Sequence, residues 1–293
     1  MKSLIIDEKY QNLRLDKALC RILDVSFALS QKIIRQKKVK INGKNCQASH
    51  KLEQGDLLEI WYELDLRKIS ATKKSNLTKA QIIKFKSYII YEDDKILAIN
   101  KPSGLATQGG SGITTSVDDF ARQNSWQLVH RLDKDTSGCL LIAKNKEIAD
   151  LLTLLFKSKN IDKTYLALVN GLPNKNFGQI AIPLRKKIQG KNEKVMPDFE
   201  QGKEAITNFK VLKKFTDYSL VELKPITGRT HQLRVHMKEL GHAIINDVKY
   251  GGKVVLRKDI SNRLCLHAQR ITINDYFGQK LQINAPIPKE MGL

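Results

Sequence analysis

The first sixty residues combine helical spacing with strand-like alternation of hydrophobic positions. Residues 14–23 place their apolar side chains three or four positions apart, which predicts a helix, and residues 29–35 predict a second, shorter one. Residues 39–44 alternate apolar and polar side chains around an Asn-Gly pair, which is typical of a strand that enters a hairpin turn. Residues 57–62 predict one more strand. Together these elements predict a small α/β domain over residues 12–63.

The pattern changes twice further along the chain. Residues 64–87 are polar and rich in lysine, so we expect a linker there. From residue 88 onward, short apolar strands alternate with helices and hairpins, which predicts the fold class α+β with a mixed, largely antiparallel sheet over residues 88–293. The predicted strands are 96–99, 140–143 and 165–169, the helices 148–156 and 230–240, and the hairpins 206–224 and 271–284.

Charge adds the first functional indication. The 293 residues include 51 Lys+Arg and 30 Asp+Glu, which gives a net charge of +21 and favours association with polyanions such as RNA or DNA. Residues 26–51 contain basic side chains and no acidic one. Net charge alone does not separate a specific nucleic-acid partner from a generally basic surface.

Composition also narrows the classes of protein and of site. No stretch approaches the roughly 20 apolar residues of a membrane span, and the N-terminus lacks the apolar core of a signal peptide, so we expect a cytoplasmic protein. The four cysteines form no CxxC pair, and His231 and His236 lie five positions apart, unlike a helical zinc pair. We therefore expect no metal site.

The densest polar segment is His130–Gly138, directly before an apolar strand. For Asp135, Thr136 and Ser137 we favour a structural role in a tight turn. Asp133 has basic neighbours on both sides, so we expect its carboxylate to stay ionised and its pKa to be lowered. An ionised carboxylate in a fixed loop can act as a nucleophile or as a base.

A second polar segment spans Gly228–His236. Thr230 is a plausible N-cap for the following helix, and Arg229 would then lie at the helix entrance, where its side chain reaches into a cleft. A solvated basic helix is the simpler interpretation, and we prefer it for Lys238. It is less suited to Arg229, His231 and Arg234, which lie close together in the sequence.

Five sequence blocks carry a family resemblance. HRLDKDTSG at residues 130–138 resembles the signature of the RluA-type pseudouridine synthases, and NKPSG, KTYLALVNG, GRTHQLRVH and LHA resemble the other blocks of that family, in family order. The first 62 residues look like an S4-type RNA-binding domain. With the GGSG segment at 109–112, the whole is most similar to the branch that modifies large-subunit ribosomal RNA, the RluC type.

The resemblance implies an activity and a set of site residues. The chain would be an isomerase that converts uridines of 23S ribosomal RNA to pseudouridine, as a monomer and without a cofactor. Asp133 would be the catalytic aspartate, Arg229 its ionic partner, and Tyr165 the aromatic side chain against the uracil. Further RNA contacts would come from Arg131 and His130, and in the S4-like domain from Lys32, Arg35, Lys37, Lys38, Lys40 and Lys44.

Two other functions remain to be compared with this one. A non-catalytic S4-type RNA-binding protein, for example a ribosome assembly factor, would explain the charge but leave Asp133 and Arg229 without a role. A glycoside or nucleoside hydrolase would need a second carboxylate near the first, and Asp135 is the near candidate in the sequence.

Overall fold

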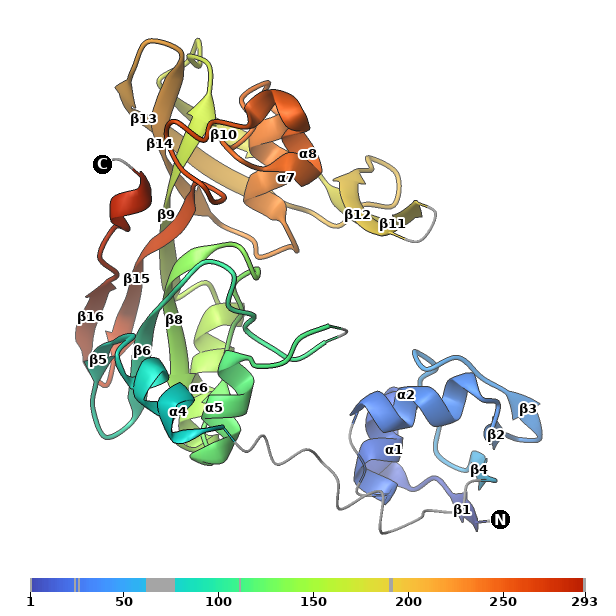
Figure 1. Ribbon diagram of the computed structural model, residues 1–293. Helices are drawn as coiled ribbons and strands as arrows, with labels where there is room; N and C mark the ends of the chain where they lie inside the picture. Colours follow the sequence, from blue (N-terminus) through green and yellow to red (C-terminus); the bar gives the residue numbers. More distant parts are fainter. Residues whose placement is uncertain are drawn as a thin grey trace. The chain divides into compact units, whose positions relative to one another are not determined.

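The protein is described here from a computed structural model, which covers residues 2–23, 25, 27–61, 77–110, 112–189 and 192–291. The chain splits into two compact units, residues 1–76 and 77–293, and each is treated by itself (Figure 1). Residues 64–76 of the expected linker, and Ser111 of the GGSG segment, lie outside the described residues.

The N-terminal unit packs two helices against a four-stranded antiparallel sheet in the order β1-β4-β2-β3. The expected hairpin turn is confirmed, because Asn42 and Gly43 have φ of 50° and 74° between β2 and β3. The sheet also contains β1, which precedes the predicted start of the domain at residue 12 and pairs with β4. The elements are β1 (Lys2–Ile5), α1 (Leu15–Leu23), α2 (Phe27–Arg35), β2 (Val39–Ile41), β3 (Lys44–Asn45) and β4 (Leu57–Ile60).

The second unit is built on a ten-stranded sheet, which confirms the predicted α+β class. The strand order is β10-β13-β14-β9-β15-β8-β6-β5, with β16 beside β15 and β7 beside β8. The pairs are antiparallel apart from β8 and β15, so the sheet is mixed and largely antiparallel. Its strands are β5 (Ile89–Glu92), β6 (Ile96–Lys101), β7 (Gln127–Leu128), β8 (Ser137–Ala143), β9 (Ile161–Asn170), β10 (Phe177–Ala181), β13 (Ile206–Lys214), β14 (Tyr218–Pro225), β15 (Leu266–Tyr276) and β16 (Gln279–Asn284).

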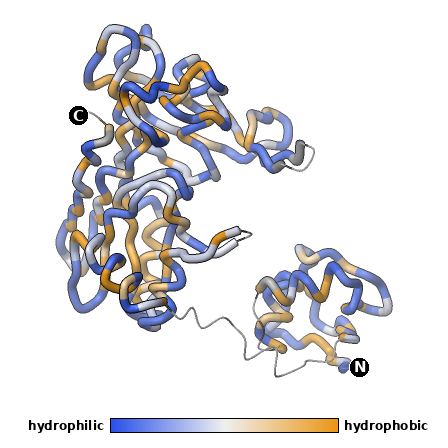
Figure 2. The backbone as a smooth tube through the Cα atoms, in the orientation of Figure 1, coloured by the Kyte–Doolittle hydropathy of each residue, from blue (hydrophilic) through white to orange (hydrophobic). Residues whose placement is uncertain are grey.

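Helices cover both faces of this sheet because its strands are apolar on both sides. Alternate residues of β6 and β8 pack on different helices: Ile96 lies in one core cluster with α6 (Lys146–Lys157), whereas Leu97 lies in another with α5 (Val117–Gln123). The hydropathy colours of Figure 2 show apolar segments along the central strands.

The structure differs from the expected linker in its second half. Residues Lys79–Lys86 form α4, which begins with a capping box at Thr78. Phe85 of α4 is buried and stacks on Phe120 of α5 at 4.9 Å between ring centroids. Residues 77–87 therefore belong to the second unit.

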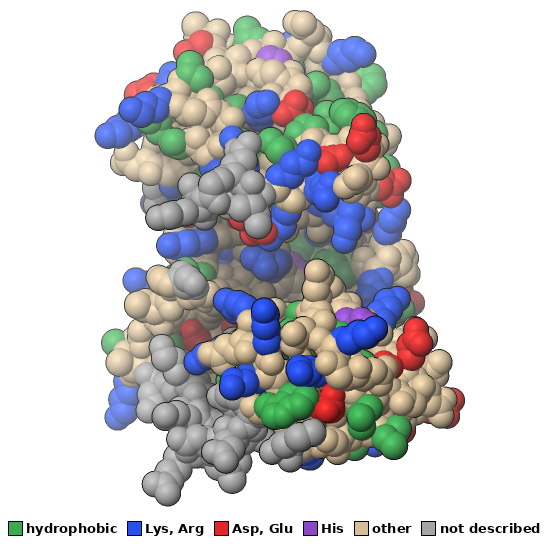
Figure 3. Space-filling view, turned by 90° about the vertical axis from the view of Figure 1, so that its right-hand side faces the viewer, with side chains coloured by type: hydrophobic (Ala, Val, Ile, Leu, Met, Phe, Trp, Pro, Cys, Tyr) green, Lys and Arg blue, Asp and Glu red, His purple; other side chains and the backbone are tan. Residues whose placement is uncertain are grey.

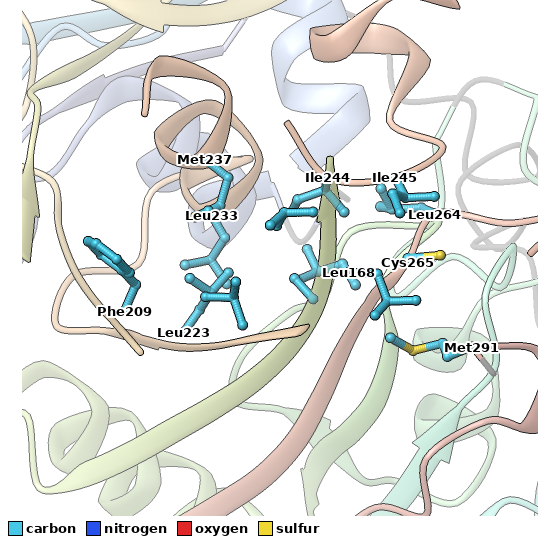
Figure 4. Packing of buried hydrophobic residues seen from close by; sticks show 14 of the residues in the cluster. Leu168, Phe209, Leu223, Leu233, Met237, Ile244, Ile245, Leu264, Cys265 and Met291 are labelled. Carbon is cyan, nitrogen blue, oxygen red and sulfur yellow. The ribbon is translucent and has the colours of Figure 1, made fainter. Parts of the chain in front are cut away.

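The helix α7 (Gln232–Glu239) packs on the sheet half formed by β9, β13 and β14. Its Leu233 and Met237 join Leu168, Phe209 and Leu223 in a buried cluster (Figure 4). A separate two-stranded hairpin, β11 (Leu184–Gln189) with β12 (Asn192–Pro197), and the short α8 (Val248–Gly251) lie next to this helix in the fold. None of the helices in the described ranges is long and apolar enough to cross a membrane.

Gly138 shows why the polar segment at 130–138 ends in glycine. It has φ of 115°, and a Cβ at this position would stand 2.2 Å from the backbone oxygen of Ala268. Here β8 and β15 run parallel, with Gly138 opposite Ala268. Any side chain would push these two strands apart, and the loop that carries Asp133 directly precedes this contact.

Candidate active site

One cleft of about 600 Å³ contains all five residues that the sequence predicted for the site of the second unit, His130, Arg131, Asp133, Tyr165 and Arg229. Its walls come from the loop before β8, from α6, from β9 and from the segment between β14 and α7. The remaining lining residues include Thr153, Phe156, Lys157, Lys163, Glu204, Thr227, Thr230, His231, Gln232, Arg234 and Leu266.

The loop that carries Asp133 is held in place by hydrogen bonds to its backbone. The Thr107 hydroxyl donates to the carbonyl of Leu132 at 2.7 Å and accepts from the Leu132 N–H at 3.2 Å. The Ser103 hydroxyl donates to the carbonyl of Asp135 at 2.7 Å. Because both flanks are bonded and Leu132 is buried, the carboxylate of Asp133 projects from a fixed backbone.

Lys101 also holds this loop in place through hydrogen bonds, a role that the sequence did not suggest. Its side chain is fully buried, and its ammonium group donates to the carbonyls of Pro102, Leu105 and Lys134 at 3.1, 2.7 and 3.0 Å. Burial lowers the pKa of Lys101 to about 7, against the attraction of Asp135 and Asp133. The NKPSG block predicted only a turn here.

Asp133 lines the cleft and is half-buried beside His231 and Arg234. Its Oδ2 atom is 4.0 Å from Nη1 of Arg234 and 3.8 Å from Nε2 of His231. Burial raises the pKa of Asp133 above 3.8, although Arg234, Arg131 and Lys101 act to lower it. The expectation of a lowered pKa was wrong, because the sequence showed the basic neighbours and not the burial.

The structure also corrects the expected partner of Asp133. Arg229 is exposed, and its Nε–H donates to the carbonyl of Glu204 at 2.9 Å. The ion pair within 4.0 Å of Asp133 is made by Arg234 instead. Arg229 still lines the cleft, where it can contact a ligand. The expected N-cap is likewise wrong: α7 is preceded by His231 with φ of 52° and without a side-chain cap bond, not by Thr230.

Arg234 is positioned by a second carboxylate, which the sequence reasoning missed. Its guanidinium group donates to both oxygens of Asp247, at 2.8 and 2.7 Å, and the side chain of Asp247 is fully buried. A two-pronged pair of this kind fixes the plane of the guanidinium group. Nε and Nη2 of Arg234 thus bind Asp247, and Nη1 is left to face Asp133.

His130 and Tyr165 are both half-buried and line the cleft. Nε2 of His130 accepts from the backbone N–H of Leu141 at 2.8 Å, and burial lowers the pKa of His130 to about 3, so the ring is neutral and does not supply charge to Asp133. Tyr165 lies on β9, and burial and the nearby Asp133 raise its pKa. Its phenol therefore stays protonated at neutral pH.

Thr136 and Ser137 of the motif make structural contacts, as expected for a turn, whereas the side chain of Asp135 is exposed. The N–H of Thr136 donates to the carbonyl of Asp133 at 3.1 Å. Buried Ser137 bonds to Nδ1 of His267 at 2.8 Å and accepts from Arg263 at 2.7 Å. Within the described ranges, no three His, Cys, Asp or Glu side chains are grouped closely enough to hold a metal ion.

In the N-terminal unit, the six predicted RNA contacts lie on α2 and on the segment up to β3. Lys32, Arg35, Lys37, Lys38 and Lys44 are exposed, while Lys40 is half-buried with its ammonium group 5.0 Å from the centre of the Trp61 ring. Ile33 and Ile34 of the same helix are buried, so the helix turns its apolar side inward as predicted.

Comparison with known proteins agrees with this arrangement. Residues 95–239 match the family model described as RNA pseudouridylate synthase, and residues 13–58 match the S4 domain. The matched segment contains the loop of Asp133 and all of α7. A relative from Rickettsia bellii, ribosomal large subunit pseudouridine synthase C, is 42% identical over 94% of this chain and 94% of its own.

The chain belongs to the RNA pseudouridylate synthase family. Proteins with the same description from Rickettsia felis and Vibrio vulnificus are 40% and 36% identical, over 94% and 98% of this chain and 93% of their own in both cases. The synthase is therefore an isomerase that acts on RNA, and not the non-catalytic RNA-binding protein or the hydrolase considered as alternatives.

Solved structures share the fold of the second unit. Human RNA pseudouridylate synthase domain containing 1 is 31% identical, with a TM-score of 0.58 over 68% of this chain and 83% of that one. Human RNA pseudouridylate synthase domain containing 4 matches with a TM-score of 0.61 over 73% of this chain and 93% of that one, at 24% identity. At 24% identity, the match to the domain containing 4 protein shows a shared fold and no more.

Proposed function

We propose that the synthase converts specific uridines of large-subunit ribosomal RNA to pseudouridine, with Asp133 as its catalytic carboxylate. The observation that carries the residue assignment is the placement of Asp133: a half-buried carboxylate on a fixed loop that lines the cleft, 4.0 Å from the Arg234 guanidinium. The substrate is proposed from the relatives, whose descriptions name the ribosomal large subunit.

The reaction breaks the bond between the ribose C1′ and N1 of uracil, rotates the base and forms a bond between C1′ and C5. The hydrogen on C5 leaves as a proton and N1 gains one, so the product is an isomer of the substrate. Asp133 either attacks the ribose or first takes a proton from the sugar, and both steps need the ionised carboxylate. Arg234 offers that negative charge a partner within the cleft. Nothing is oxidised or reduced, and no group arrives from outside, so the proposed reaction needs no cofactor.

Tyr165 and Arg131 have different tasks in this proposal. A uridine that leaves the RNA stack needs an aromatic face to rest on, and Tyr165 provides one in the cleft wall with Asp133. Arg131 is exposed at the rim of the same cleft, two residues from Asp133. Its planar guanidinium group can stack between bases and fill the gap that the flipped uridine leaves.

We propose that the exposed cations of the N-terminal unit bind RNA phosphates. Replacing Lys32, Arg35, Lys37 and Lys38 with Gln in the full chain should then lower the slope of log affinity against log salt by about 3, because each phosphate contact adds about 0.7 for single strands. The control removes four charges from exposed positions of the second unit, Lys146, Lys175, Lys210 and Lys280. Equal changes in slope would refute the assignment.

The substrate is tested by mapping pseudouridines in ribosomal and transfer RNA from cells with and without the gene. The proposal expects sites in large-subunit ribosomal RNA to disappear and to return when the gene is restored. Loss confined to transfer RNA would overturn the choice of substrate while leaving the activity intact. We further propose that one chain acts alone in the cytoplasm, since a single chain provides every side chain assigned above.

A further inference from the structure

A chain of hydrogen bonds connects the β11–β12 hairpin to the neighbourhood of Asp133. The backbone N–H of Val195, in β12, lies 3.3 Å from the Tyr250 hydroxyl and donates to it. The same hydroxyl lies 2.6 Å from Nδ1 of His231. The other ring nitrogen of His231, Nε2, is 3.8 Å from Oδ2 of Asp133.

The direction of these hydrogen bonds follows from the partners of the Tyr250 hydroxyl. The hydroxyl oxygen of Tyr250 already accepts from Val195, so its own proton is left to donate, and among the described residues Nδ1 of His231 is the acceptor recorded for it. A neutral imidazole that accepts at Nδ1 carries its proton on Nε2. That N–H faces the carboxylate of Asp133, whereas a lone pair on Nε2 would face it with repulsion.

The surroundings of His231 keep the ring neutral. Burial lowers the pKa of His231 to about 4, and the cations Arg234, Lys249 and Lys186 act in the same direction, against Asp247. The ring also makes a T-shaped contact with the Tyr250 ring, at 5.5 Å between centroids and 76° between planes, which restricts its orientation. His231 itself adopts a left-handed backbone with φ of 52°, a conformation uncommon for a residue other than glycine.

We propose that His231 is a positioning residue for Asp133, which presents a neutral Nε2–H to the carboxylate and owes this tautomer to Tyr250. This inference rests on the proposed catalytic role of Asp133. A neutral donor can direct one oxygen of the carboxylate without adding a second positive charge beside Arg234. The 3.8 Å separation is longer than a hydrogen bond, and contacts of this kind shorten in the complex with substrate.

The hairpin at the start of these hydrogen bonds is rich in basic side chains. Arg185, Lys186 and Lys187 lie on β11, and Lys and Arg side chains gather around this part of the surface (Figure 3, upper half). Lys249, next to Tyr250, donates to the carbonyl of Glu193 on β12 at 3.0 Å, which adds a second contact between the hairpin and α8.

The tautomer is measured directly by ¹⁵N NMR of the full chain with labelled histidine, at neutral pH. The chain has six histidines, and the His231 signal is assigned by its absence in His231→Gln. The inference expects the Nε2–H form for His231. His130 is the internal reference for the opposite tautomer, since its Nε2 accepts from Leu141. An Nδ1–H form of His231 in the wild type would overturn the inference, whatever the activity of any variant.

Kinetics of three variants test the role. His231→Gln can place an amide N–H near the position of Nε2, whereas the side chain of His231→Met cannot donate a hydrogen bond. We expect kcat to fall by about 10- to 100-fold in the Met variant and to be partly restored in the Gln variant. KM should change little in either variant. Tyr250→Phe should split the His231 signal between both tautomers and lower kcat. Lys238→Gln, an exposed change on α7, is the control.

Two results separate this inference from the catalytic assignment. Full kcat in a folded His231→Met variant would remove the positioning role but leave Asp133 untouched. Normal turnover in an Asp133→Asn variant would instead remove the catalytic assignment, while the tautomer of His231 would still be measured. Thermal unfolding of each variant shows whether a loss of activity reflects a loss of folded protein.

Discussion

Arg234 combines a structural and a catalytic task, and the structure allows the two to be separated. Its guanidinium group makes two charge-assisted hydrogen bonds to Asp247, which is fully buried, while Nη1 lies 4.0 Å from Oδ2 of Asp133. Arg234→Met keeps much of the apolar length of the side chain but leaves Asp247 buried without its partner. Breaking one side of a buried pair costs about 3–5 kcal/mol, so the variant should unfold at a much lower temperature.

The double variant Arg234→Met with Asp247→Leu replaces the whole buried pair with apolar side chains. Most of the lost stability should return, since replacing a whole buried pair is often close to neutral. Activity should not return, because Asp133 still lacks its guanidinium partner. Loss of Arg234 also removes one of the charges that lower the pKa of Asp133, so the acid side of the profile of kcat/KM against pH should move to higher pH in both variants.

The assay pairs urea unfolding with release of tritium from RNA that contains 5-tritiated uridine. Arg229→Met is the matched control for stability. Arg229 is exposed, and within the described residues its recorded hydrogen bond goes to the backbone carbonyl of Glu204. We expect Arg229→Met to change stability by less than about 0.5 kcal/mol. Recovery of both stability and turnover in the double variant would refute the reasoning, since Arg234 would then matter only as the partner of Asp247.

Two further predictions concern the loop and its surroundings. Burial raises the pKa of Asp133 in the folded chain, so the stability that comes from its protonated form is present below pH 3.8 and is lost as pH rises through the folded pKa. At neutral pH the Asp133→Asn variant should therefore be more stable than the wild type. Equal stability of the two proteins at neutral pH would contradict the raised pKa. Gly138→Ala should destabilise the second unit by about 1–3 kcal/mol or more, as measured by urea unfolding, because its Cβ would meet the Ala268 backbone; a change within about 0.5 kcal/mol would show that β8 and β15 can separate there.

The sequence predicted the elements whose periodicity is set by burial. The helix at 148–156 and the two hairpins at 206–224 and 271–284 appear as α6, β13–β14 and β15–β16. The β11–β12 hairpin was missed because much of it is charged and stands apart from the ten-stranded sheet, so no apolar period marks it. The helix α4 was missed for a similar reason: only Phe85 of its residues is buried.

The candidate site shows the limit of a sequence pattern more sharply. The motifs at 130–138 and 228–236 both reach the cleft, but they could not show which arginine faces Asp133. That choice depends on the left-handed backbone of His231, which starts α7 two residues later than expected and brings Arg234 to the carboxylate. Asp247 lies 13 residues beyond Arg234, and no spacing in the sequence connects the two. Burial of Asp133 is likewise a property of the folded chain.

The most direct test of the central claim compares Asp133→Asn with Asp135→Asn. Both variants replace a carboxylate with an amide of the same shape, but Asp133 lies in the cleft, whereas Asp135 is exposed in the neighbouring turn. Tritium release and RNA binding are measured for each. We expect Asp133→Asn to bind RNA and release no tritium, and Asp135→Asn to remain active. Normal release from Asp133→Asn, or loss of release from a folded Asp135→Asn alone, would contradict the assignment of Asp133 as the catalytic carboxylate.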